Sequence, residues 1–321
     1  MTRVARRFRF IASMPRLAEG VSAWRAALGR IEELGYSTIA ISDHFTQGWA
    51  MEPIVTLAAA ARETAGVRLL TMVLGNDYRH PVLVHKAAAT IDVLSGGRLE
   101  LGLGAGWLRA EYEAAGIIYE TARTRRERLE EAVMVIRGLF GPTPFNFAGK
   151  HYSIAALDGL PKPVQKPHPP FAVGGGGQRM LELAGRVADI AGVYANLGRG
   201  TLDVHPVLDM SPERVSEKVK FVHDGARSAA RDPAGIELQL SLLLCRVVRS
   251  VSDAHEILDQ TAASWRVPVK TIAASPAVLV GTIEHCAELL LERRARYGFS
   301  YIHVGADFEN ASQLVSRLAG S

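Results

Sequence analysis

The sequence has little cysteine, few aromatic residues and no long hydrophobic run. Its two cysteines, Cys245 and Cys286, lack the spacing of metal ligands, so we expect reduced thiols in a core and neither a disulfide nor a metal site. The longest uncharged apolar run, 54–61, is far too short to cross a bilayer, and arginines interrupt residues 1–14. These absences predict a cytoplasmic protein with no membrane partner.

The sequence also lacks a long cluster of residues with the same charge. The formal net charge is +4, but basic and acidic residues are mixed, as in the stretch 123–131. Such mixing is typical of a solvated helix face, and no basic stripe with interleaved aromatics occurs. We therefore predict no nucleic-acid partner, and at most a preference for an anionic small molecule.

Short runs of β-forming residues alternate with longer segments of helical period along the whole chain. Strands are expected at 8–14, 38–42, 69–74, 99–104, 171–174, 190–194, 238–248 and 302–305. Helices are expected around Trp24 to Leu34 and at 53–64, 81–94, 125–140, 180–187, 213–230 and 283–297. Eight alternations within 321 residues favour an α/β fold of the (β/α)8 barrel type, as a single domain over 1–321, rather than a doubly wound sheet.

Two irregular stretches interrupt this alternation. Residues 141–170 are rich in proline and glycine and contain the hairpin-like pieces 145–147 and 151–153, which predicts an insertion after the fourth strand and its helix. Residues 196–212 form a second insertion after the sixth strand. Because loops that follow barrel strands form the catalytic face, we expect both insertions to contact substrate.

The fourth expected strand alternates leucine with glycine and runs into Gly104-Ala105-Gly106-Trp107. Glycine weakens a strand, so Gly102, Gly104 and Gly106 need another reason to be there. One interpretation is the close approach of a large ligand. The other is that small inward residues make room for neighbouring parts of a barrel.

Two further segments carry candidate chemistry. Asp43 and His44 follow the second strand, at the barrel end where enzymes keep reactive groups, although an isolated pair of this kind often only ties down a loop. The run Gly174-Gly175-Gly176-Gly177-Gln178 leads directly into a helix. Free N–H groups and a helix dipole meet there, so we favour a phosphate site over a flexible turn. It is neither a Walker A loop nor a Rossmann fingerprint.

Together, these segments resemble the bacterial luciferase-like family of flavin and deazaflavin oxidoreductases. The resemblance is carried by Ile41-Ser42-Asp43-His44-Phe45, His80-Pro81, 94–107, Glu111-Tyr112, the glycine run and Leu279-Val280-Gly281-Thr282. It covers nearly the whole chain, and 95–107 is its most specific part. The chain length and Ser-Asp-His-Phe look most like the branch that uses coenzyme F420, while the flavin mononucleotide (FMN) branch shares the general motifs.

The resemblance implies roles for individual residues. A non-prolyl cis peptide would fall at Met72-Val73, behind the middle ring of the cofactor, with Asn76 on the cofactor side as well. Gly104, Ala105 and Gly106 would border the ring or its side chain, Gly174 to Gln178 would hold the phosphate, and Trp49 and Trp107 would lie on the substrate side. Trp107 stands where sugar-phosphate dehydrogenases of the family have a glutamate that transfers a proton, which disfavours that activity. Glu111, four residues later, is an alternative proton-transfer group, but we expect it to start a helix and make structural hydrogen bonds.

The resemblance also implies a mechanism. A hydride would pass between C5 of the deazaflavin and a small electron-poor substrate such as an activated alkene, imine or carbonyl. His44 would carry the accompanying proton, and Asp43 would fix its tautomer and orientation. The alternatives are an FMN-dependent monooxygenase that uses oxygen and a non-catalytic flavin- or deazaflavin-binding protein. A homodimer formed through barrel helices is also implied.

Overall fold

A closed barrel of parallel strands forms the centre of the molecule. The computed structural model describes residues 6–46, 51–197 and 206–321. The barrel strands are β1 (Arg9–Ser13), β2 (Thr38–Ile41), β3 (Arg68–Thr71), β5 (Leu99–Gly104), β8 (Phe171–Gly175), β9 (Ile190–Val193), β10 (Glu237–Ser241) and β13 (Phe299–His303). Pairing of β3 with β5 closes the ring, and β4 (Leu74–Gly75) extends the third strand beside β5. The predicted (β/α)8 barrel is confirmed.

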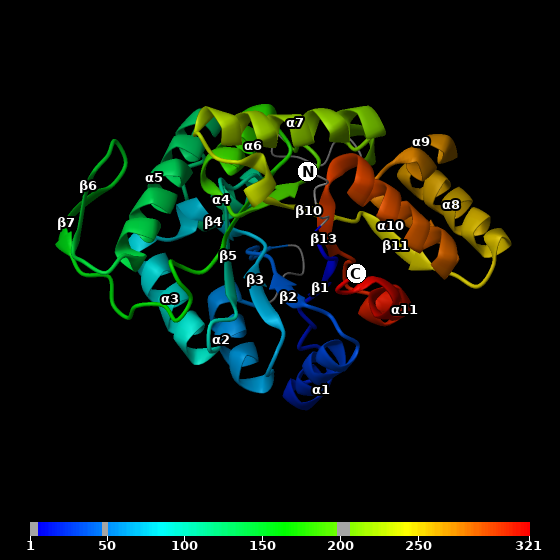
Figure 1. The fold of residues 1–321 in the computed structure, drawn as a ribbon, viewed down its shortest axis with the longest axis horizontal. Helices are drawn as coiled ribbons and strands as arrows, with labels where there is room; N and C mark the ends of the chain where they lie inside the picture. Colours follow the sequence, from blue (N-terminus) through cyan, green and yellow to red (C-terminus); the bar gives the residue numbers. More distant parts are fainter. Residues whose placement is uncertain (1–5, 47–50, 198–205) are drawn as a thin grey trace.

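Helices surround the strands (Figure 1). They are α1 (Val21–Glu33), α2 (Pro53–Glu63), α3 (Pro81–Leu94), α4 (Arg109–Ala115), α5 (Ala122–Phe140), α6 (Gln178–Val187), α7 (Pro212–Ser228), α8 (Val251–Trp265), α9 (Val269–Ala274), α10 (Ile283–Tyr297) and α11 (Phe308–Leu318). Short 3-10 turns lie at η1 (Asn76–Tyr78), η2 (Pro206–Asp209) and η3 (Pro233–Gly235). Proline opens α2, α3 and α7, where its missing N–H costs no hydrogen bond. Side chains of Thr121, Ser211 and Thr282 cap the helices that follow them.

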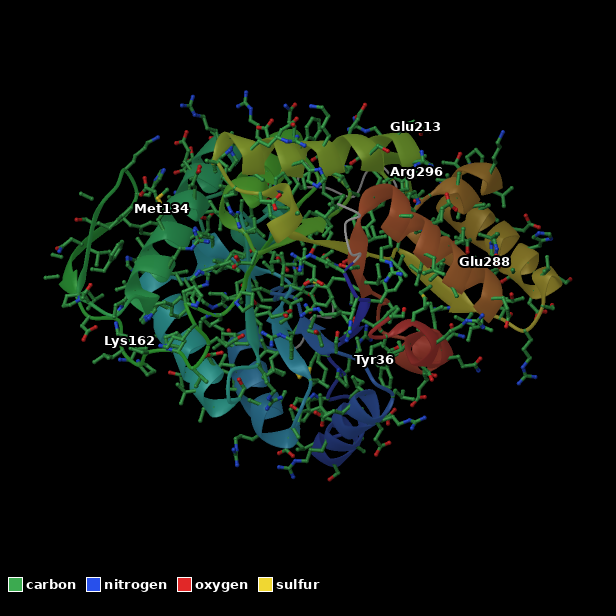
Figure 2. The ribbon with its side chains drawn as sticks, in the orientation of Figure 1. Tyr36, Met134, Lys162, Glu213, Glu288 and Arg296 are labelled. Carbon is green, nitrogen blue, oxygen red and sulfur yellow. The ribbon has the colours of Figure 1, made fainter. Side chains whose placement is uncertain are left out.

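Side chains fill the space between strands and helices (Figure 2). Inside the barrel, Ile11, Ala40, Leu70, Ala172, Ile190 and Tyr301 form a buried apolar layer. The loop after α1 is tied to the last helix, because the Tyr36 hydroxyl donates to the Phe308 carbonyl at 2.7 Å. Figure 2 shows Tyr36 beside α11. The first and last βα units are therefore joined in the helical layer as well as by the pairing of β1 with β13.

A buried charge cluster closes the amino-terminal end of the barrel. The Glu100 carboxylate accepts from Arg9 at 2.8 Å, from Arg68 at 2.6 Å and from the Tyr301 hydroxyl at 2.5 Å. Burial raises the pKa of Glu100, but the two guanidinium groups and these hydrogen bonds outweigh burial and leave the pKa below its ordinary value. Glu100 therefore stays ionised, and the cluster leaves the carboxyl ends of the strands as the open end.

The expected strand 238–248 is wrong as a single element. Its ladder partner changes between two neighbouring residues: the Leu242 N–H donates to the His303 carbonyl, and the Leu243 N–H donates to that of Ala277. The chain thus leaves the barrel after β10, and β11 (Leu244–Val247) pairs with β12 (Val278–Gly281) outside it. With α8 and α9, this pair forms an excursion after the seventh barrel strand that the sequence pattern did not indicate (Figure 1).

The insertion 141–170 contains the expected hairpin, with strands β6 (Phe145–Ala148) and β7 (Ser153–Leu157). The hairpin lies against α5, because the Glu131 carboxylate accepts from the N–H groups of Lys150 and His151 at 2.8 Å each. Figure 1 shows it at the edge of the molecule.

Three further findings concern composition. Cys245 and Cys286 are free and buried, as predicted. No helix within 6–46, 51–197 and 206–321 is long and apolar enough to cross a membrane. Over the same ranges, no group of three histidine, cysteine or acidic residues is arranged to hold a metal ion.

Candidate active site

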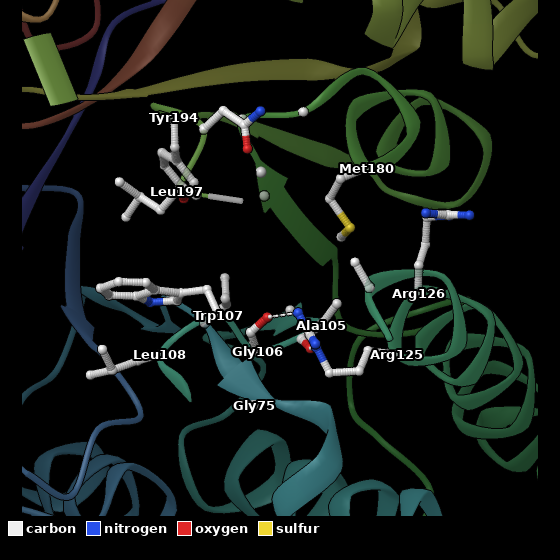
Figure 3. Close-up of a pocket in the computed structure, with 18 of the residues that line it drawn as sticks. Gly75, Ala105, Gly106, Trp107, Leu108, Arg125, Arg126, Met180, Tyr194 and Leu197 are labelled. Carbon is white, nitrogen blue, oxygen red and sulfur yellow. Dashed lines mark hydrogen bonds between the residues drawn. The ribbon is translucent and has the colours of Figure 1, made fainter. Parts of the chain in front are cut away.

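A cavity of about 630 Å³ opens at the carboxyl ends of the barrel strands (Figure 3). Its volume lies within the range typical of small-molecule and cofactor sites. The segments that line it follow β2, β3, β5, β8 and β9, and their residues are Asp43, His44, 72–75, Tyr78, 104–108, Tyr119, Ala122, Arg125, Arg126, 174–180 and 194–197.

Nearly all the predicted site residues meet in this cavity. Asp43, His44, Met72, Val73, Gly104 to Trp107 and Gly174 to Gln178 line it. Asn76 does not: it is 4% exposed, and its amide donates to the Tyr152 hydroxyl at 3.3 Å. Trp49 lies outside the described residues.

The two insertions differ in their relation to the cavity. Asn196 and Leu197, at the start of the second one, line it. No residue of 141–170, all of which the structure describes, lines it, so this insertion forms no part of the cavity wall, and its contact with substrate stays a prediction. That insertion follows a helix rather than a barrel strand, and for this reason it begins at the opposite end of the barrel.

The cis peptide predicted at Met72-Val73 is present, between β3 and β4. The glycines of β5 lie against it. A Cβ on Gly102 would collide with the Thr71 carbonyl oxygen, and one on Gly104 would lie 2.5 Å from Val73 Cγ2. A Cβ on Gly106 would collide with the Tyr112 hydroxyl, and Gly106 has φ +71°. Of the two interpretations, room for neighbouring protein atoms accounts for these glycines.

The glycine run after β8 is also held by contacts within the protein. Cβ atoms on Gly174 and Gly176 would collide with Tyr194 and with the Ala195 backbone, whereas Gly177 has ordinary clearance, 3.6 Å from Asn196. Gly177 is the N-cap of α6 and offers no side chain to the first N–H groups of that helix. The positive end of the helix dipole therefore faces the cavity without an internal cap, as an anion site requires.

A buried lysine that sequence reasoning missed anchors this run. The Lys218 ammonium group donates to the Gly176 carbonyl at 2.5 Å and to Asp209 Oδ2 at 2.7 Å. Asp209 Oδ2 in turn accepts from the Asn196 N–H at 2.7 Å. Lys218 is 1% exposed and lies among buried valines of α7. A lysine on the apolar face of this expected helix was the sequence feature that could have identified it.

Three arginines line the cavity, with different surroundings. Arg125 is buried: it donates to the carbonyls of Ala105 at 3.1 Å and Glu120 at 2.5 Å, and lies over the Tyr119 ring at 4.0 Å. It therefore shapes the 104–107 turn. Arg126 and Arg179 are more exposed. Figure 3 shows Arg126 and Met180 at one end of the cavity and Trp107 at the other.

His44 and Asp43 have separate partners. The Nδ1 atom of His44 lies 2.8 Å from Glu111 Oε2, and its ring meets Trp107 edge-on at 5.9 Å. Asp43 instead accepts from the Gly75 N–H at 2.9 Å and from both terminal nitrogens of Arg79. The expectation that Asp43 orients His44 is therefore wrong, because Arg79 occupies that carboxylate. Glu111 takes the orienting position.

Glu111 is buried and collects several donors. Besides His44, it accepts from the N–H of Phe45 at 3.1 Å, the N–H of Thr46 at 3.2 Å and the Thr46 hydroxyl at 3.0 Å. Burial raises the pKa of Glu111, but the hydrogen bonds from His44 and Thr46 outweigh burial and leave the pKa below its ordinary value. The carboxylate is thus ionised at neutral pH and favours a proton on Nδ1 of His44.

These features fit a flat ring with an anionic tail. Met72, Val73 and Ala105 offer an apolar wall, and the uncapped start of α6 offers N–H groups to an anion. Arg126 and Arg179 add positive charge on the same side. The residues present therefore suit a flavin or deazaflavin.

Comparisons with known proteins point the same way. The chain is 29% identical to an F420-dependent glucose-6-phosphate dehydrogenase of Amycolatopsis mediterranei, over 66% of this chain and 62% of that one. It is 28% identical to an FMNH(2)-dependent dimethylsulfone monooxygenase of Pseudomonas putida, over 49% and 44%. The chain thus spans less than two-thirds of the length of each of these relatives.

The solved structures add the fold. An F420-dependent secondary alcohol dehydrogenase in complex with an F420-acetone adduct superposes with a TM-score of 0.76 at 19% identity, over 98% of both chains. The model of the luciferase-like monooxygenase family matches residues 10–301. Because this match includes nearly the whole described barrel, the chain belongs to the luciferase-like monooxygenase family.

Proposed function

We propose that this protein is a coenzyme F420-dependent oxidoreductase that transfers a hydride between C5 of the deazaflavin and a small organic substrate. The observation that carries the proposal is the His44–Glu111 pair, a proton carrier with its orienting carboxylate, on the wall of a cavity suited to a deazaflavin. Relatives named as F420-dependent dehydrogenases, at 29–34% identity, support this choice of cofactor.

Each part of the cavity has a task in this proposal. Met72, Val73 and Gly104 to Gly106 would hold the ring, and Gly174 to Gln178 with Lys218 behind them would hold the phosphate. When bound, F420 supplies hydride donor and acceptor chemistry at C5. Glu111 holds the proton on Nδ1 of His44, so Nε2 is the atom that exchanges a proton with the substrate. The strand ends that form the cavity wall would hold the ring and the substrate in a fixed geometry.

Trp107 narrows the range of possible substrates. It follows the glycine turn at the position where the sugar-phosphate dehydrogenases of the family carry a glutamate, and it meets His44 edge-on at 5.9 Å. A neutral aromatic side chain cannot take up a proton there. We therefore propose a substrate other than a sugar phosphate.

Titration of the purified protein with F420 and with FMN, each followed by absorbance and by oxygen uptake, tests the function. We expect F420 to bind in the micromolar range or tighter and to undergo no oxygen-consuming turnover. Tighter binding of FMN with oxygen uptake in its reduced form would favour the second candidate, a monooxygenase, which the similarity to the dimethylsulfone monooxygenase motivates. If F420 or FMN binds but no substrate is turned over, the remaining candidate is a non-catalytic protein that carries the cofactor.

A further inference from the structure

The inner face of the barrel at its open end has two unlike halves. Met72, Gly104 and Gly174, at the ends of the third, fourth and fifth strands, line the cavity proposed for the cofactor. The opposite half consists of β1, β10 and β13, the last of which lies between the other two. Its carboxyl ends carry polar residues to which the proposed chemistry assigns no role.

The register of the strands places these side chains on one face. Ser241 of β10 pairs with His303 of β13, and Gln239 pairs with Tyr301 two residues earlier. Paired residues of neighbouring strands point to the same side of a sheet. Tyr301 belongs to the buried layer inside the barrel, so Gln239, Ser241 and His303 also face inward.

Hydrogen bonds join the residues of this face to one another, and Tyr194 of the cavity wall packs beside it. Ser13 Oγ lies 2.9 Å from His303 Nε2, which braces the imidazole from β1. The Gln239 amide donates to Ser241 Oγ at 3.0 Å. Tyr194, which lines the cavity, lies beside Gln239: a Cβ on Gly192 would be 2.4 Å from the Tyr194 hydroxyl and 3.0 Å from Gln239 Oε1. The polar face therefore adjoins the cavity wall at Tyr194, although its own four residues do not line the cavity.

One atom of this face lacks a partner. Gln239 is 2% exposed, and its Oε1 atom is buried with no hydrogen bond to any described residue. Leaving a buried acceptor unpaired is destabilising, so the arrangement is unusual for a purely structural wall. His303, Ser13 and Ser241, in contrast, are partly exposed. The face therefore combines one buried acceptor without a partner, on Gln239, with the more accessible side chains of Ser13, Ser241 and His303.

The face carries no formal charge. Burial lowers the pKa of His303 to about 4, so the imidazole is neutral at pH 7. Among the described residues, no lysine or arginine donates a hydrogen bond to Ser13, Gln239, Ser241 or His303. Two hydroxyls and one neutral imidazole, with no helix N-terminus or cation among their partners in the described part of the chain, compensate the desolvation of a carbonyl or hydroxyl group better than that of a carboxylate or phosphate.

We propose that Ser13, Ser241 and His303 form a substrate subsite for a carbonyl or hydroxyl oxygen of an uncharged molecule, opposite the ring wall. This inference rests on the proposed function for the identity of the cofactor, but the subsite itself is a property of β1, β10 and β13. His303 is its central group, and Ser13 positions the ring. The subsite selects neutral oxygen-containing compounds over anionic ones.

Nuclear magnetic resonance with ¹³C-labelled histidine rings tests the subsite directly. Cyclohexanone serves as the neutral probe and cyclohexanecarboxylate as the charged one, added to the full-length protein with and without F420. The His303 signal is assigned by its loss in His303→Asn. We expect cyclohexanone to shift this signal and leave that of the exposed His255 unchanged, with at least a tenfold weaker effect of the carboxylate. An unmoved His303 signal, or tighter binding of the carboxylate, overturns the inference.

Calorimetry on variants provides the second readout. His303→Phe should weaken cyclohexanone binding at least tenfold, His303→Asn should restore part of it, and both should keep the F420 affinity within twofold of the wild type. Equal cyclohexanone binding by His303→Phe would contradict the subsite. Failure of the wild type to bind F420 would contradict the proposed function alone, because the cofactor-free titration still reports on His303. The wild-type titration also needs no variant to fold.

Discussion

His44 and Glu111 lie 67 positions apart in the chain, yet Nδ1 of the imidazole is 2.8 Å from Oε2 of the carboxylate. His44 follows β2, and Glu111 lies in the first turn of α4, after β5. Because Glu111 also holds the N–H groups of Phe45 and Thr46, it sets the position of the whole segment that carries the imidazole. The pair, rather than either residue alone, is the unit on which the proposed proton transfer depends.

Glu111→Gln should lower turnover about 100-fold, the range expected when general acid–base catalysis is lost, with F420 affinity within twofold of the wild type. The amide can donate to Nδ1, which places the imidazole proton on Nε2 and gives the wrong tautomer. Steady-state kinetics and cofactor titration measure both effects. Glu113→Gln, an exposed carboxylate two residues along the same helix, is the control and should behave as the wild type. Unchanged turnover in Glu111→Gln would remove the pair from the mechanism.

Lys218→Met should weaken F420 binding about tenfold, or about 1.4 kcal/mol, while turnover at saturating cofactor changes little. The reason is that Lys218 joins the Gly176 carbonyl to Asp209, and without it the glycine run loses this anchor, while Asp209 keeps only Arg214 and the Asn196 N–H as partners. Fluorescence titration of F420 gives the dissociation constant. Lys220→Met on the same helix, where the lysine is exposed, controls for the lost charge. A similar loss of affinity in both variants would mean that long-range charge, not the anchor, is responsible.

Gly102→Ala should destabilise the fold by about 3 kcal/mol, since its Cβ would meet the backbone oxygen of Thr71, which cannot move aside as a flexible side chain could. Urea unfolding followed by circular dichroism measures the free energy of unfolding. Gly29→Ala is the matched control: Gly29 lies within α1 with nothing within 4 Å of an added Cβ, so this change should stabilise by about 0.5–1 kcal/mol. Equal stability of Gly102→Ala and the wild type would show that the strand glycines are not required by their protein neighbours.

His85 should make the fold sensitive to mild acid. Burial, together with the charge of Lys162, lowers the pKa of His85 to about 4. Below pH 6.5 the unfolded chain therefore binds a proton that the folded chain accepts only near pH 4, and the free energy of unfolding falls as the pH is lowered through this window. His303, whose pKa is also lowered to about 4, acts in the same direction.

Thermal unfolding between pH 6.5 and 5, above the range where most carboxylates titrate, isolates this effect. His85→Leu should show a shallower decrease of the melting temperature with falling pH than the wild type. His255→Leu, at an exposed position of α8, should keep the wild-type slope. Parallel slopes for all three proteins would contradict the assignment of acid sensitivity to buried histidine.

Sequence patterns were informative where the physical cause is local. The alternation of β-forming and helical segments predicted the eight barrel strands, and Pro81 marked the start of α3. The pattern failed at 238–248, because a continuous run of β-forming residues contains no mark of the point at which the ladder partner changes from His303 to Ala277. It also placed the hairpin correctly in the chain, but the hairpin packs along α5 and against Asn76 instead of lining the cavity.

For the site, the sequence by itself determined which segments would meet, because closure of the barrel brings the carboxyl ends of all its strands together. The glycines of β5 and of the run after β8 indicated where other protein atoms lie close to the backbone. Only the tertiary structure decided the partners. Asp43 binds Arg79, His44 binds Glu111, and Lys218 supports the glycine run. A hydrogen bond or an ion pair needs two atoms within about 3 Å, and for residues far apart in the chain that distance is set by the packing of the whole barrel rather than by any neighbouring residue.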